Sequence, residues 1–297
     1  MMNEEQTFIE HLQKFSEEHL EHKKHLENLG VYFNEVTGSV EDLHVGHDNP
    51  LPFLIKIQAQ SLLEILEDLN SSLISSLSKG LYSSVEALSR VAIENAINVM
   101  YICGEDDTFR AKSLLKSYVT SSRERGEKWL KYSVIERDSV AEDRANTFLE
   151  TLKTAKTFLT FFNDPNVKGW PDARARFRAV GIENLYHVLF APSSNAVHGF
   201  SEDVYNLTYV EFVPVQFRQK MFNSYNAEKT SFAYYLATNA ILLYCEAVFK
   251  LSLKMENEDV AGKLFDVREK LFKLISEHEE LTAAYYGKID KNAPATN

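Results

Sequence analysis

From residue 52 onward, apolar positions recur every three to four residues over long stretches that short polar segments separate. This spacing places the apolar side chains on one face of an α-helix. The pattern predicts helices at 52–78, 81–103, 106–133, 136–162, 172–180, 182–198, 226–256 and 258–284. Gly, Pro, Asn and Asp, the residues that interrupt helices, gather between these segments. We therefore expect an all-α protein, built as a bundle of long helices.

The stretch HVGHDNPLP (44–52) is a predicted loop that divides the chain near its beginning. Before it, residues 4–29 are charged but keep apolar positions with helical spacing, so one face of this helix can dock on the body. We expect an N-terminal helical appendage at 1–45, a helical bundle domain at 50–285 and a flexible polar tail at 286–297.

One segment departs from the helical pattern. Residues 204–217, VYNLTYVEFVPVQF, are rich in β-branched and aromatic residues and alternate partially between apolar and polar. The segment is too isolated to belong to a sheet. It predicts an extended crossing segment or one small hairpin.

The composition supports long helices and limits the partners. The chain has 297 residues but only 11 Gly and 7 Pro, and its formal net charge is −11. An acidic protein is repelled by nucleic acid and by anionic membranes unless a local basic patch overcomes the field. Double-stranded DNA is therefore not expected as a partner. The two cysteines, Cys103 and Cys245, lie in apolar helical patterns, which predicts buried thiols and excludes a disulfide framework.

The most apolar run, at 231–253, is long enough to cross a bilayer, but it contains Asn239, Glu246 and Lys250. Each charge near a bilayer centre costs about 2.5–3.5 kcal/mol on insertion scales. This run therefore predicts a core helix and no membrane association. The first residues are acidic and lack the pattern of a signal peptide, so we expect a cytoplasmic protein.

A polar stripe runs along the predicted helix at 81–103, where residues four apart fall on one side: Glu86, Arg90, Glu94 and Asn98. A solvated face joined by ion pairs is one interpretation. However, Ile97 and Tyr101 share the same sector, and a helix that is apolar nearly all round is usually buried. A partly buried polar site is the other interpretation, and it requires that the charges be paired and further hydrogen-bonded.

The stretch YHVLFAPSSNAVHGF (186–200) carries a second set of residues four apart: Tyr186, Phe190, Ser194 and His198. Pro192 predicts a kink or a restart of the helix. Gly199 suits the position after a helix C-terminus, where His198 would gain from the helix dipole without any catalytic role. Because the stripe is aromatic, we expect His198 to face the helix that holds Arg90 and Glu94.

Together, SRVAIENAINVMYI and the later helix with tyrosine, serine and a final His-Gly resemble an uncharacterised family of bacterial all-helical proteins over about residues 55–255. That family is similar to the HEPN superfamily (higher eukaryotes and prokaryotes nucleotide-binding). The resemblance implies a metal-independent ribonuclease of a toxin or antiviral defence system, which acts as a homodimer on RNA or binds nucleotides, without a cofactor. It implies that His198 is the catalytic histidine, a general acid or base on the ribose 2′-OH.

The chain departs from the HEPN pattern at one place. Those proteins carry an Arg shortly before the His, whereas residues 191–193 are Ala, Pro and Ser. Without that guanidinium, no neighbouring residue holds the scissile phosphate through two parallel hydrogen bonds. Arg90 is the candidate that replaces it, in one pocket with Glu94 and His198.

A basic stretch at 167–180, VKGWPDARARFRAV, contrasts with the acidic total. Basic residues interleaved with Trp170 and Phe177 suit single-stranded nucleic acid, and they also suit docking onto an acidic surface of this chain or of another copy. The expected catalytic set is His198, Arg90 and Glu94, and the expected substrate-binding set is Tyr186, Ser194, Asn195, Arg174 and Arg178.

Several chemistries are not expected. The sequence has no Gly-rich phosphate loop, no nucleophile elbow and no Cys-x-x-Cys pair. His19, His22 and His25 lie three apart, but charged residues surround them and no cysteine joins them, which predicts a solvated face and no metal site. The alternative to a nuclease is a non-catalytic helical protein-interaction module, in which Arg90 and Glu94 form a structural ion pair.

Overall fold

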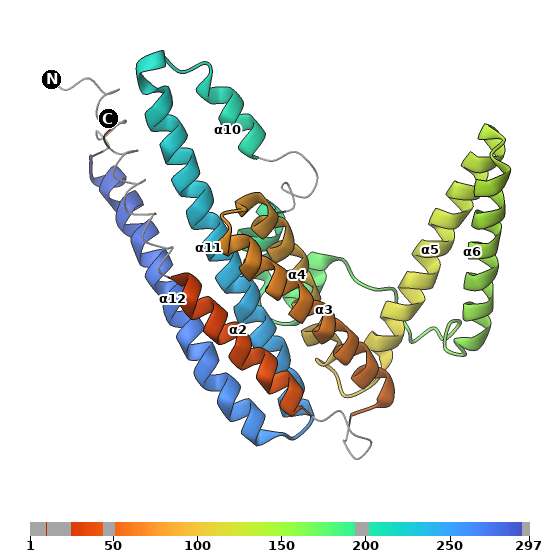
Figure 1. The fold of residues 1–297 in the computed structure, drawn as a ribbon. Coiled ribbons are helices and arrows are strands. Elements are labelled where there is room, and N and C mark those ends of the chain that lie inside the picture. Colours follow the sequence, from red (N-terminus) through yellow and green to blue (C-terminus); the bar gives the residue numbers. More distant parts are fainter. Residues whose placement is uncertain (1–9, 11–24, 44–50, 194–201, 293–297) are drawn as a thin grey trace, which may run out of the picture.

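A computed structural model describes residue 10 and residues 25–43, 51–193 and 202–292. Every regular element within these ranges is helical, which confirms the predicted all-α class. The main body consists of α2 (His25–Asp42), α3 (Phe53–Ser78), α4 (Tyr82–Ile102), α11 (Val215–Lys254) and α12 (Glu258–Asn292). We call these five helices the bundle (Figure 1).

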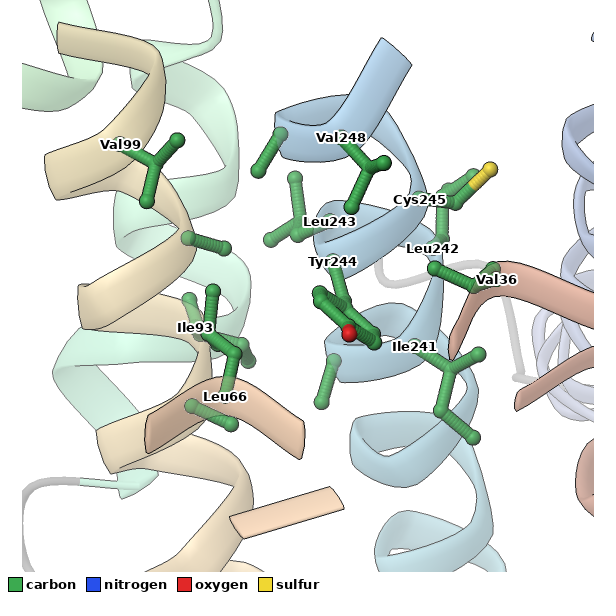
Figure 2. Close-up of a cluster of buried hydrophobic side chains, with 14 of the residues drawn as sticks. Val36, Leu66, Ile93, Val99, Ile241, Leu242, Leu243, Tyr244, Cys245 and Val248 are labelled. Atoms are coloured by element: carbon green, nitrogen blue, oxygen red, sulfur yellow. The ribbon is translucent and has the colours of Figure 1, made fainter. Parts of the chain in front are cut away.

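Helix α11 is the centre of the bundle, with α4 and α3 on one side and α12 and α2 on the other. Leu66 of α3, Ile93 of α4 and Tyr244 of α11 are fully buried and converge in the core (Figure 2). Among the described helices, α11 is the one long and apolar enough to cross a membrane, and 78% of its most apolar window is buried. This burial fits the predicted core helix, and the cytoplasmic location stays a prediction.

Helix α2 packs against α11 and α12. Leu29 and Val36 are fully buried there, and Lys263 of α12 pairs with Asp42 at 2.8 Å. This part of the predicted appendage therefore contributes to the core of the bundle. The predicted boundary at 44–50 and most of residues 1–24, His19 and His22 among them, lie outside the described residues, so the domain division stays a prediction.

The predicted extended segment at 204–217 was wrong. Residues Glu202–Val210 form helix α10, and α11 begins at Val215, directly after Pro214. β-Branched and aromatic residues are only weak evidence for a strand without a neighbouring strand to pair with. Pro214 is also no obstacle, because a proline is tolerated at the very start of a helix. Helix α11 therefore starts 11 residues before its predicted start at 226.

Helices α5 (Phe109–Glu136) and α6 (Ser139–Phe158) form an antiparallel pair that stands away from the bundle (Figure 1). We call residues 109–158 the arm. Its base is fixed by Gln58 of α3, whose side-chain amide donates to the Ala111 carbonyl at 2.9 Å. At its tip Arg137 adopts a left-handed conformation (φ 56°), and Asp138 caps α6 by accepting from the Ala141 N–H at 3.0 Å.

Both cysteines are buried in the bundle, as predicted. Burial disfavours the thiolate and raises the pKa of Cys103 to about 11 and that of Cys245 to about 12. Neither thiol is therefore ionised to a useful extent at neutral pH.

Candidate functional site

The polar stripe of α4 lies partly buried at the side of the bundle. Arg90 and Glu94 approach to 3.5 Å (Nη1 to Oε2), and their side chains are 17% and 31% exposed. Their spacing of four residues along one helix is sufficient to bring the two groups together. The stripe is therefore neither a fully solvated face nor a sealed core site, which matches the second interpretation of the sequence.

A second arginine joins the stripe from the short helix α7 (Ala173–Ala179). The Arg176 guanidinium lies 2.8 Å from Oε1 of Glu94 and also donates to Oδ1 of Asn98. Its side chain is only 6% exposed. Asp172 fixes the start of α7 by accepting from the Ala175 N–H at 2.8 Å. The Glu94 carboxylate therefore has one guanidinium at each oxygen.

Aromatic rings cover both guanidinium groups. The Arg176 guanidinium lies 5.3 Å from the centre of the Trp170 ring, and the Arg90 guanidinium lies 4.4 Å from the centre of the Phe190 ring. A cation over an aromatic face gains about 0.5–2 kcal/mol, more when water is excluded. Tyr101 meets Trp170 edge-on at 5.2 Å, which holds that ring in place. We call Arg90, Glu94, Asn98 and Arg176 the arginine cluster.

The segment that supplies Phe190 has an unusual helical turn. Helix α8 (Glu183–Leu185) continues into a π-helical turn, η2 (Tyr186–Phe190), whose closing N–H, that of Ala191, donates to the Tyr186 carbonyl. Pro192 has no N–H for the Val188 carbonyl, which is a physical reason for a wider turn at this point. One residue further on, the Ser193 hydroxyl donates to the Leu189 carbonyl at 2.6 Å. The predicted kink is thus a π turn, a feature that is frequent at functional sites.

The basic stretch at 167–180 divides into an inner and an outer part. Arg174 and Arg178 point outward and both pair with Glu183 at 2.7 Å, whereas Arg176 points into the arginine cluster. Hydrogen bonds from Arg178 and then Arg174 lower the pKa of Glu183 to about 2. The sequence prediction chose the two outer arginines and missed Arg176. The sequence did offer a signal that Arg176 points inward. It lies next to the apolar Phe177, which is buried, and on the side of α7 opposite Arg174.

The structure describes only part of the predicted site. Tyr186 is among the described residues, and the centre of its ring lies 5.7 Å from that of Phe177 and 5.5 Å from that of Phe190. His198, Ser194 and Asn195 lie in 194–201, outside the described residues. Their predicted meeting with Arg90 and Glu94 therefore stays a prediction.

A model of a protein family matches residues 62–211, just over half of the chain, and its description is a family of unknown function, DUF5677. The chain belongs to this family. The matched region contains the arginine cluster, the π turn, the arm and α10. No curated protein and no solved structure matches the chain significantly. The DUF5677 match carries no function, and a relationship to HEPN proteins stays a proposal.

The arginine cluster is partly buried, and its two arginines outnumber its single carboxylate. Two guanidinium groups share one carboxylate, so the three charged groups sum to +1 in a chain whose net charge is −11. A planar guanidinium is suited to bind carboxylate and phosphate oxygens in pairs. Within the described ranges, no three His, Cys, Asp or Glu side chains gather closely enough to hold a metal ion. Arg90, the more exposed of the two arginines, is the better placed to meet an anion from outside.

Proposed function

We propose that this protein is a HEPN-like RNA-binding protein that cleaves RNA without a metal ion, with Arg90 as its phosphate-binding arginine. The observation that carries the proposal is the contact between Arg90 and Phe190, 4.4 Å from guanidinium to ring centre. Phe190 belongs to the segment that leads to His198, eight residues further on. Arg90 would thus supply the positive charge that the segment before His198 lacks.

The two arginines would have different roles. Arg176 is nearly buried and binds both Glu94 and Asn98, so it acts as a structural cation that fixes the Glu94 carboxylate. Arg90 meets the same carboxylate at a longer distance, 3.5 Å, and is more exposed. An RNA phosphate approaching from solvent would therefore meet Arg90 first, with Glu94 holding that guanidinium in orientation.

The reaction would be a transfer within the RNA chain. His198 takes the proton of a ribose 2′-OH, and the 2′ oxygen attacks the neighbouring phosphorus. The bond from phosphorus to the 5′ oxygen of the next nucleotide breaks, and that oxygen receives a proton. The products are a 2′,3′-cyclic phosphate and a 5′-OH. Arg90 would stabilise the negative charge that grows on the phosphoryl oxygens.

The test is an incubation of purified protein with a mixture of RNAs in the presence of a chelator. His198→Ala should lower cleavage by about 10²–10⁴-fold, the usual contribution of a general acid or base. Arg90→Ala should also abolish cleavage, and Arg90→Lys should retain a fraction of it, because the charge remains but the two-pronged contact does not. Arg144→Ala, an exposed arginine on α6, is the control. Cleavage that survives His198→Ala, or that requires a divalent metal, would overturn the mechanism.

A non-catalytic protein-interaction module is the second candidate, and two observations favour it. The arginine cluster is largely satisfied within the chain, as a structural ion-pair network would be. The arm also exposes several large apolar side chains, among them Ile135 and Val140 near its tip. Under this function Arg90→Ala would lower stability, and no RNA cleavage would be detected for any variant.

A further inference from the structure

One side of α5 exposes three aromatic side chains where the arm stands clear of the bundle (Figure 1). Tyr118 and Tyr132 are 58% and 64% exposed, and Trp129 between them is also exposed. At 3.6 residues per turn, these three rings and the exposed Arg125 fall within a sector of roughly 60°. They lie along one side of α5 over a length of about 20 Å, and we call them the arm stripe.

This stripe has the composition of a protein interface. Trp, Tyr and Arg are the residues that contribute most strongly to binding at the centres of protein contacts. Contiguous apolar patches on a soluble protein commonly mark an interaction site. The arm also has little core of its own, because Ser122, Gly126 and Ala145 make up much of the buried seam between α5 and α6. A covering partner would therefore add the apolar burial that two helices cannot supply alone.

The charges indicate which partner fits. Residues 109–158 contain 11 Lys and Arg against 7 Asp and Glu, a net charge of +4. The remaining residues contain 21 Lys and Arg against 36 Asp and Glu, a net charge of −15. The arm is thus basic on an otherwise acidic molecule. A second copy of the chain offers the arm a surface of opposite charge.

The outer face of α3 matches the arm stripe in length and chemistry. Phe53, Ile57 and Ile65 are exposed on α3. Glu64 and Asp68 are exposed on the same side, whereas Lys56, the one basic residue of α3, is buried. From Phe53 to Asp68 this face is about 22 Å long. Within one molecule the arm contacts α3 only near its base and then diverges (Figure 1), so its stripe does not cover this face.

We propose that two copies of this chain form a dimer by reciprocal docking, in which the arm stripe of each copy lies along the outer face of α3 of the other. The aromatic rings of the stripe pack on Phe53 and Ile57, and Arg125 faces Glu64 and Asp68. Each arm thereby gains the apolar partner that its own seam lacks. This dimer does not depend on the proposed RNA chemistry, because neither surface includes a residue of the arginine cluster.

The test is a charge exchange on the full-length protein, measured by analytical ultracentrifugation over a range of concentrations. Arg125→Glu places acid against acid in the dimer, and Glu64→Arg places base against base. Each variant alone should dimerise at least about tenfold more weakly than the wild type. An equimolar mixture of the two should form a mixed dimer with wild-type affinity, because both of its contacts then join opposite charges. Arg144→Glu on α6 is the control and should leave dimerisation unchanged.

The outcomes separate the alternatives. Circular dichroism should show all variants folded, since each changed side chain is exposed. Rescue in the mixture supports the reciprocal dimer. A monomeric wild type, or a dimer that neither charge reversal weakens, overturns it. A wild-type monomer that binds a labelled single-stranded RNA, and loses that binding with Arg125→Glu, would instead assign the stripe to nucleic acid.

Discussion

In the bundle, α11 packs against α4 through large buried side chains such as Ile93 and Tyr244, whereas α5 and α6 of the arm meet largely through small ones. A Cβ atom on Gly126 would lie only 2.8 Å from Cδ2 of Leu149 and 3.1 Å from Cδ1 of Phe148. The helices of the arm are therefore close together at this glycine, but the seam buries little apolar surface.

The difference shows that helices of similar length can bury very different amounts of apolar surface. A buried leucine or isoleucine contributes about 1.5–3 kcal/mol when removed from water, and the bundle contains many of them in one continuous core. The arm contributes few residues to that core, and those lie at its base, as Ala111 does. We expect the bundle to set the global stability and the arm to open at lower cost.

The largest expected effect is in the bundle. Ile93→Ala should lower the free energy of unfolding by about 2–5 kcal/mol, because Ile93 is fully buried and its truncation leaves a cavity. Leu152→Ala in the arm removes a side chain that is also buried, yet it should change the main unfolding transition much less. Urea unfolding followed by circular dichroism measures both. Equal losses in the two variants would mean that arm and bundle unfold as one unit.

The next effect is in the arginine cluster, at the side of the bundle. Glu94→Gln keeps the shape of the side chain but leaves the nearly buried Arg176 without its carboxylate. Hydrogen bonds to charged groups contribute about 1.5–3 kcal/mol, so a loss of that size is expected in the same unfolding experiment. Glu150→Gln is the matched control, because its pair with Lys153 is exposed. A loss no larger than that of the control would show that the cluster does not stabilise the fold.

The third prediction tests the seam of the arm. Gly126→Leu cannot fit beside Leu149 and Phe148 unless α5 and α6 separate, and overpacking of this kind costs about 1–3 kcal/mol. Amide hydrogen exchange should become faster in both helices of the arm and stay unchanged in α11. Gly262→Leu on α12 is the control, since nothing lies within 4 Å of a Cβ there. Faster exchange throughout the bundle would contradict the independence of the arm.

Much of the fold could be predicted from the sequence, because apolar periodicity depends on local geometry that every helix shares. The helices at 52–78 and 81–103 were predicted within two residues of α3 and α4. The segment at 204–217 was not, since β-branched residues such as Val204 and Val215 lie exposed on helices and the deciding factor is the surrounding structure. Nor does periodicity indicate that α5 and α6 leave the bundle, because their seam uses small and polar residues.

The candidate site was less accessible to sequence reasoning. The spacing of Arg90 and Glu94 was enough to predict their ion pair, because both lie on one helix. Arg176 joins them from 82 positions beyond Glu94, and only tertiary packing brings it there. Pro192 indicated an irregularity in the helix, but the sequence did not show that it takes the form of a π turn at Tyr186–Phe190.

The smallest expected effect is at the rim, where Glu183 accepts hydrogen bonds from Arg178 and Arg174. These lower its pKa from the ordinary value of 4.5 to about 2. A carboxyl group whose folded pKa is depressed stabilises the fold above its unfolded pKa, and this contribution is lost as the pH falls from about 4.5 through about 2.

A carbon-13 NMR titration should therefore give a midpoint near 2 for Glu183 in the wild type. Arg178→Ala should raise that midpoint more than Arg174→Ala, because the Arg178 hydrogen bond lowers the pKa most. A midpoint near 4.5 in the wild type would show that the outer arginines do not hold this carboxylate.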